Sequence, residues 1–167
     1  HRLTTCYRPL AHGGIEVQDQ AETSPFLSAP KLVSGGGGLV STAGDYLKFC
    51  EALRSHHPAL VGRRTLVLMT ANHLPGGKDL QQLSRAAFSE AAYPGNGFGL
   101  GFATTTDIHR TMLAGSNGDY FWGGAASTAF WIDPAEELTV LFLTQLIPSS
   151  TWPVRRQLRT MVYAALA

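Results

Sequence analysis

The run STAFWIDPAEELTVLFLT, residues 127–144, limits the choice of fold more than any other part of the chain. Two of its segments, Ser127–Ile132 and Leu138–Thr144, have the length and the β-branched and aromatic content of strands. The connection between them, Asp133–Glu137, is of hairpin length, which favours antiparallel pairing. Leu138–Leu143 is apolar nearly throughout, so we expect that strand to be covered on both faces.

Helices are predicted on both sides of this strand pair. Downstream, Pro153 stands at a first-turn position, and a single apolar stripe follows it: Val154, Leu158, Met161, Val162 and Ala165. Upstream, Thr42 is typical of a helix cap, and Asp45 is its capping-box partner. A second helix is predicted over Arg63–Asn72 and a weaker one over Lys78–Phe88.

The order of these elements predicts an α+β fold, because helices, then antiparallel strands, then a helix follow one another along the chain. Two further strands are expected at Phe98–Thr104 and Arg110–Ala114. We divide the chain into an irregular lead-in at 1–40 that wraps the rest of the fold, a helical segment at 41–92, and antiparallel strands plus the C-terminal helix at 93–167. In the lead-in, a short strand is expected only at Ile15–Val17.

Composition excludes several classes of protein. The 167 residues include 13 basic and 12 acidic side chains with a net charge of +1 and no basic stripe, which argues against a nucleic-acid partner. No apolar run approaches the ~20 residues of a membrane span. The six histidines are scattered without metal-ligand spacing, so no metal site is expected. Cys6 and Cys50 are interpreted as free thiols; the compartment stays open, with the cytoplasm slightly favoured over secretion or the periplasm.

Three short motifs invite a functional interpretation that their context does not support. Ser28-Ala29-Pro30-Lys31 has the S-x-x-K spacing of a nucleophilic serine and its lysine, but Pro30 pushes Ala29 out of the helical region, so a surface turn is predicted. The alternating glycines of 95–101 lead into a strand, and Gly35–Gly38 lacks a following Lys-Ser or Lys-Thr. Neither glycine run is therefore predicted to bind phosphate.

The loop over residues 115–128 is the remaining candidate site. It is rich in turn residues and becomes a strand in which only small residues follow Trp122. Such a strand leaves backbone N–H and C=O groups uncovered, so a substrate carbonyl can lie against it and an N–H can serve as an oxyanion donor. Close packing of the strand against a helix is the alternative interpretation.

The chain resembles the C-terminal part of class C β-lactamase-like serine hydrolases, and most closely their esterase branch. The resemblance runs in order from about Leu32 to the terminal helix. It is carried by these stretches: Ser34–Tyr46, Gly97–Phe102, Trp122–Thr128, Trp131–Pro134 and Leu143–Gln145. It implies the serine β-lactamase and penicillin-binding-protein-like fold, with an antiparallel sheet, flanking helices and a C-terminal helix.

The same resemblance implies an incomplete catalytic apparatus. In that family the serine and lysine of S-x-x-K and the tyrosine of Y-x-N precede the matched region, and no convincing copy of either motif occurs here. The chain begins at His1 without an initiator methionine, as a fragment or a processed chain would. We therefore expect the nucleophile to lie outside these residues, and residues 1–40 and one sheet face to bury against the missing N-terminal portion. The chain alone is expected to be inactive and prone to aggregate.

The third catalytic element of the family is K-T-G or H-x-G, and Trp122-Gly123-Gly124 stands in its place. By position, Ala125 would give its backbone N–H to the oxyanion hole, Trp122 would line the pocket, and the two glycines would keep the strand flat. Tyr120, with Asp119 on the preceding loop, is expected to contact substrate, and the alternative interpretation is that the two residues shape the turn. Because an indole is neutral, the resemblance implies neutral esters as preferred substrates over anionic β-lactams.

The implied mechanism is acyl transfer through an acyl-serine intermediate, without a metal or an organic cofactor. The expected partners are a small-molecule ester or β-lactam and the N-terminal portion, with no nucleic acid and no membrane span. Two alternatives stay open. One is a non-catalytic binding protein that kept the fold, and the other is an acyltransferase that passes the acyl group to an alcohol or an amine.

Overall fold

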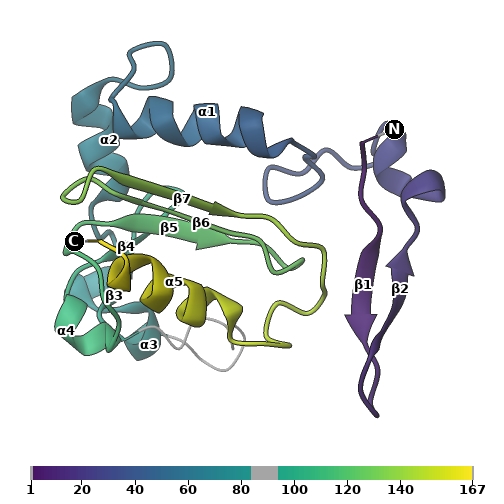
Figure 1. The fold of residues 1–167 in the computed structure, drawn as a ribbon. Helices are drawn as coiled ribbons and strands as arrows, with labels where there is room; N and C mark the ends of the chain where they lie inside the picture. Colours follow the sequence, from purple (N-terminus) through teal and green to yellow (C-terminus); the bar gives the residue numbers. More distant parts are fainter. Residues whose placement is uncertain (1, 84–93, 167) are drawn as a thin grey trace.

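The computed structural model describes residues 2–83 and 94–166 (Figure 1). Within them an antiparallel sheet has the strand order β3-β4-β5-β6-β7. The strands are β3 Asn96–Phe98, β4 Ala103–Thr105, β5 Tyr120–Gly123, β6 Ala129–Asp133 and β7 Leu138–Phe142. With helices on both faces of this sheet, the α+β prediction is confirmed.

The hairpin of β6 and β7 forms where the sequence predicted it. Ala129 lies opposite Phe142 at one end and Asp133 opposite Leu138 at the other. Every residue of β6 is buried, whereas every residue of β7 is only half-buried. The prediction that β7 is covered on both faces is therefore wrong. The strand in that position is β6, since β7 ends the described sheet.

The main core lies between the sheet and two helices, α1 Ala43–Arg54 and α2 Arg63–Thr70. Helix α1 begins as predicted, because the Thr42 hydroxyl accepts a hydrogen bond from the Asp45 N–H at 3.2 Å. The side chains that meet in this core are Cys50, Leu53, Leu66, Phe102, Tyr120, Phe130 and Ile132. On the opposite face lies α5, Val154–Ala164 (Figure 1). Its Tyr163 hydroxyl donates to the buried Asp133 carboxylate at 2.7 Å.

Two predicted strands are wrong in detail. Over Arg110–Ala114 the chain instead forms the short helix α4, Ile108–Thr111, whose cap is Asp107, and the left-handed Met112 ends it. The stretch Phe98–Thr104 is broken by a turn, in which the Gly99 N–H donates to the Phe102 carbonyl and Gly101 takes a φ of 101°. This turn is what allows β3 and β4 to pair with each other. The predicted helix Lys78–Phe88 is described only over α3, Leu80–Leu83, and its remainder lies outside the described residues.

The lead-in is more regular than predicted. Strands β1 Cys6–Pro9 and β2 Ile15–Asp19 form an antiparallel hairpin, so the prediction of a single short strand is wrong. Tyr7 joins this hairpin to the segment that follows β7, because its N–H donates to Gln145 at 2.9 Å and its carbonyl accepts from Ile147 at 2.9 Å. The remaining short turns of helix are 3-10 segments: Ala21–Thr23, Pro25–Leu27 and Pro75–Gly77.

The segment between the hairpin and α1 is mostly exposed. Val33 and Leu39 are 89% and 93% accessible, respectively. Burial of this segment against another part of a longer protein stays a prediction. Among the described residues, none of the helices combines the length and the apolar character needed to cross a membrane.

Candidate active site

The last two residues of β5 extend beyond the strand that flanks it. Pairing between β4 and β5 is limited to Thr104 with Tyr120 and Ala103 with Phe121. On its other side β5 stays paired with β6 as far as Gly123 opposite Ala129. Within the described residues, the backbone after Phe121 is therefore covered by β6 on one side and open on the other.

A tight turn follows at the open end of β5. The Ser127 N–H donates to the Gly124 carbonyl at 3.1 Å, and the Gly124 N–H donates to the Thr128 carbonyl at 3.1 Å. Ser127 takes a φ of 68°, which lets the chain enter β6. The prediction that a strand begins at Ser127 is thus shifted, since β6 begins at Ala129.

The direction of the backbone groups identifies which of them face the open side. In an antiparallel ladder successive residues direct their N–H groups to alternate sides. Because the Gly124 N–H points toward β6, the N–H of Gly123 points the other way. The Gly124 carbonyl accepts from the Ser127 N–H across the turn, so the Ala125 N–H of the same trans peptide group points away from that contact. Ala125 is exposed, and within the described residues its N–H donates no hydrogen bond. The role of Ala125 as an oxyanion donor stays a prediction.

Close contacts explain why glycines follow Trp122. A Cβ on Gly123 would lie 2.6 Å from Cζ of Arg155 in α5, and one on Gly124 would lie 2.6 Å from the Thr128 hydroxyl. Both distances are well below van der Waals contact, so any side chain would displace its neighbour. The need for space is a more specific reason for these glycines than a flat strand.

Trp122 forms an apolar wall beside the open edge. Its side chain is 39% exposed and lies on the same sheet face as the core, and its ring meets that of Phe98 edge-to-face at 5.0 Å. Phe98 is held in turn by Asn72, whose side-chain oxygen accepts from the Phe98 N–H at 3.1 Å. Gly97 and Gly99 leave room for Asn72 and for the carbonyl of Met69. The prediction that these glycines lead into a strand is confirmed, and the close contacts explain why glycine stands at both positions.

Tyr120 lies in the core and not in the candidate site. It is 2% exposed, its ring packs against Phe102 at 5.3 Å, and burial raises the pKa of its hydroxyl to about 12. This burial conflicts with the predicted contact between Tyr120 and substrate. We therefore leave Tyr120 out of the proposed substrate-contacting residues.

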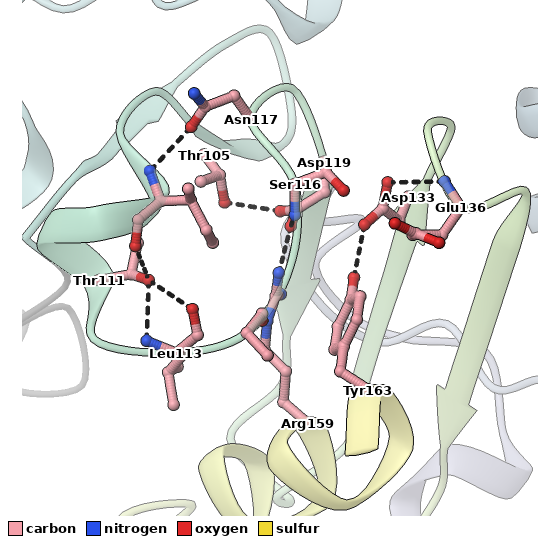
Figure 2. A network of polar contacts seen from close by, with 12 residues as sticks. Thr105, Thr111, Leu113, Ser116, Asn117, Asp119, Asp133, Glu136, Arg159 and Tyr163 are labelled. Carbon is pink, nitrogen blue, oxygen red and sulfur yellow. Dashed lines mark hydrogen bonds and ion pairs between the residues drawn. The ribbon is translucent and has the colours of Figure 1, made fainter. Parts of the chain in front are cut away.

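The loop before β5 is fixed by a buried polar network that the sequence did not reveal (Figure 2). Asp119 is fully buried, accepts a hydrogen bond from the Thr105 hydroxyl at 2.6 Å and forms an ion pair with Arg159 of α5. Arg159 also donates to the Ala114 carbonyl at 2.9 Å. Burial raises the pKa of the Asp119 carboxyl, and Arg159 and Thr105 oppose this effect. The network holds β4, the loop and α5 together.

The nucleophilic side chains considered in the sequence analysis, Ser28, Cys6 and Cys50, are not arranged for catalysis. Ser28 is extended, with φ −124° and ψ 162°, and its hydroxyl donates to the Pro25 carbonyl, so it shares no helical turn with Lys31. Cys6 and Cys50 are free thiols, as predicted. Burial raises the pKa of Cys50 to about 11, which keeps that thiol protonated at neutral pH. In residues 2–83 and 94–166 no three His, Cys, Asp or Glu side chains gather as metal ligands would.

A family model described as Beta-lactamase matches residues 1–161. The chain belongs to the Beta-lactamase family. Two curated relatives from Mycobacterium tuberculosis are each 31% identical to this β-lactamase-family chain over 128 residues. They are Protein Rv1367c of strain ATCC 25618 / H37Rv and Uncharacterized protein MT1414 of strain CDC 1551 / Oshkosh. The match covers 74% of the chain but 32% of each relative, so the chain spans about a third of their length.

Solved structures share the fold. Simvastatin synthase (LovD) from Aspergillus terreus has a TM-score of 0.76 and 24% identity, over 96% of this chain and 42% of that protein. EstCE1, described as a hydrolase with promiscuous acyltransferase activity, has a TM-score of 0.74 and 26% identity, over 95% of this chain and 43% of that protein. The β-lactamase-like fold expected from the resemblance is thereby confirmed. The chain spans less than half of either structure.

Proposed function

We propose that this chain is the C-terminal portion of a serine hydrolase that cleaves neutral carboxylic esters and whose nucleophilic serine lies outside these residues. The observation that carries the proposal is the exposed Ala125 N–H, which points to the open side of β5 beside the half-exposed indole of Trp122. Family membership supports the reaction class.

The proposed reaction proceeds in two steps through a covalent acyl-enzyme. In the first, the serine oxygen attacks the ester carbonyl, and the C–O bond to the alcohol breaks as that alcohol takes up a proton. In the second, water attacks the acyl-serine, releases the carboxylic acid and returns the proton to the serine. Each attack places negative charge on the carbonyl oxygen, and the Ala125 N–H donates to that oxygen in both steps.

Trp122 supports the preference for neutral substrates. Its side chain presents an apolar face and one N–H donor where related enzymes that act on penicillins carry lysine or histidine. A substrate carboxylate would gain no charge-assisted contact from this residue. The acyl and alcohol groups of a neutral ester can pack on the indole instead.

Replacing Ala125 with proline tests the proposal, because proline lacks the N–H. Ala125 is the second residue of the turn Gly124–Ser127, a position where proline is favoured, so the backbone can keep its course. In the full-length protein that carries this chain, A125P should lower kcat for p-nitrophenyl butyrate by about 10²- to 10³-fold. The matched variant A125S keeps the N–H and should stay close to the parent. A folded A125P protein with undiminished kcat would refute the assignment.

An acyltransferase of the same fold is the second candidate. It is favoured by the structural likeness to EstCE1, whose description includes promiscuous acyltransferase activity. Product analysis in the presence of a competing alcohol separates the two functions. A hydrolase yields mainly the acid, whereas a transferase yields mainly the new ester.

A non-catalytic binding protein is the third reading of the same fold. Labelling with a serine-reactive fluorophosphonate distinguishes it from both enzymes. The full-length protein should gain one adduct outside residues 1–167, and the 167-residue chain alone should gain none. Labelling at Ser28 would contradict the proposed location of the nucleophile.

A further inference from the structure

We propose that Arg155 is a positioning residue for this reaction, acting on the peptide group that contains the Ala125 N–H. Arg155 lies in the first turn of α5, half-buried against the turn that follows β5. A single nitrogen of its guanidinium, Nη2, donates to two backbone carbonyls, that of Gly124 at 2.7 Å and that of Thr128 at 2.8 Å. The inference rests on the proposed function, since it concerns the donor named there.

The contact to Gly124 sets the direction of the Ala125 N–H. The carbonyl of Gly124 and the N–H of Ala125 belong to one trans peptide group, and in such a group the two bonds point in opposite directions. Holding the carbonyl oxygen against Arg155 therefore directs the N–H away from Arg155. The same carbonyl accepts from the Ser127 N–H on the side of β6, so the Ala125 N–H also points away from β6.

The same contact also strengthens the donor. A cation at a carbonyl oxygen polarises the peptide group, and the hydrogen on the other end becomes a better donor, because hydrogen bonds in series reinforce one another. Charge-assisted hydrogen bonds are also stronger than neutral ones. Arg155 thus adds to the stabilisation of an oxyanion that it does not touch.

The turn has little freedom to take another orientation. The Gly124 carbonyl also accepts from the Ser127 N–H, and the Thr128 carbonyl also accepts from the Gly124 N–H. The turn is also attached to the segment that follows β7, because the Ser127 hydroxyl donates to the Leu146 carbonyl at 2.6 Å. Gly123 completes the arrangement, because a Cβ there would occupy the space of the guanidinium.

Kinetics of the full-length protein test this role with p-nitrophenyl butyrate as substrate. R155Q should lower kcat by about 10- to 100-fold and change KM by no more than about twofold. The reason is that the Ala125 N–H no longer points at the oxyanion of the transition state, while ester binding is kept. R155K should recover much of the lost kcat, since one ammonium nitrogen can replace the one nitrogen that makes both contacts. Arg156 is exposed on the same helix, and R156Q is the matched control that should leave kcat unchanged.

A double-mutant cycle tests whether Arg155 acts through Ala125. If it does, R155Q should lower kcat little further in the A125P background, because the N–H is already absent. The amide signal of ¹⁵N-labelled Ala125 gives a readout independent of catalysis. In R155Q it should move to lower proton shift and exchange faster with solvent.

The outcomes separate the two proposals. If A125P is impaired but R155Q behaves like R156Q, the role of Arg155 is refuted while the proposed function stands. If R155Q and A125P lower kcat by independent factors, Arg155 acts by another route and the inference is refuted. If A125P keeps full kcat, the proposed function itself fails. An unchanged Ala125 amide signal in R155Q would refute the orientation argument regardless of kinetics.

Discussion

The buried ion pair between Asp119 and Arg159 makes a quantitative prediction about stability. Asp119 is fully buried and Arg159 is 8% exposed, so solvent screens their interaction very little. The guanidinium of Arg159 also lies over the rings of Trp131 at 5.7 Å and Tyr163 at 5.2 Å. Replacing Arg159 by leucine would leave the Asp119 carboxylate buried without its counter-charge.

The expected cost of R159L is about 3–5 kcal/mol of unfolding free energy, the range found when one partner of a buried pair is removed. The full-length protein that carries this chain should therefore melt at a lower temperature than the parent. Urea unfolding followed by circular dichroism measures the free energy directly. D119N should cost less, because the asparagine oxygen can still accept from the Thr105 hydroxyl.

Two controls make the prediction refutable. R156L changes an exposed arginine three residues earlier on the same helix and should stay within about 0.5 kcal/mol of the parent. The double variant R159L/D119N should be more stable than the sum of the single changes predicts, because the carboxylate is gone. A cost of R159L similar to that of R156L, or strictly additive single effects, would show that the pair contributes nothing specific.

Three further predictions concern the site and the core. W122K should raise turnover of a chromogenic cephalosporin relative to p-nitrophenyl butyrate in the full-length protein, because an ammonium attracts the β-lactam carboxylate; an unchanged ratio would remove Trp122 as the selectivity residue. G123A should lower kcat as R155Q does, since its Cβ displaces the Arg155 guanidinium, whereas G62A, with no neighbour within 4 Å, should leave kcat unchanged. Unfolding free energy should fall as pH rises from 9 to 12, because burial raises the pKa of Cys50 from 9.0 to about 11 and that of Tyr120 from 10.0 to about 12. For each group, the free energy of unfolding falls by up to about 1.4 kcal/mol per pH unit between its pKa in the unfolded chain and its raised pKa in the fold. The Tyr120 hydroxyl has no hydrogen-bond partner within the described residues, so Y120F should make this fall less steep at the upper end of the pH range.

Local signals account for the elements that the sequence predicted well. The cap at Thr42 and Asp45 needs only neighbouring residues, and so does the short connection between β6 and β7. The signal for the hairpin of β1 and β2 was also present, since Gly13 and Gly14 take the positive φ of a turn and Arg8 pairs with Glu16 across the strands. These signals do not predict the hairpin by themselves, because each strand is short and neither has a strong apolar pattern.

The sequence by itself determined the α+β class, the main helices, the β6–β7 hairpin and, through resemblance, the stretch from Trp122 to Ala125 as the candidate site. These depend on periodicity, caps and short connections, which act over a few residues. Only the tertiary structure decided that Tyr120 packs in the core, that β5 extends beyond its pairing with β4 in the described part of the chain, and that α5 supplies Arg155 and Arg159 to carbonyls and a carboxylate far away in the sequence. Such contacts join residues separated by 31 and 40 positions, and no local pattern encodes them because their energy arises only when the sheet and α5 meet.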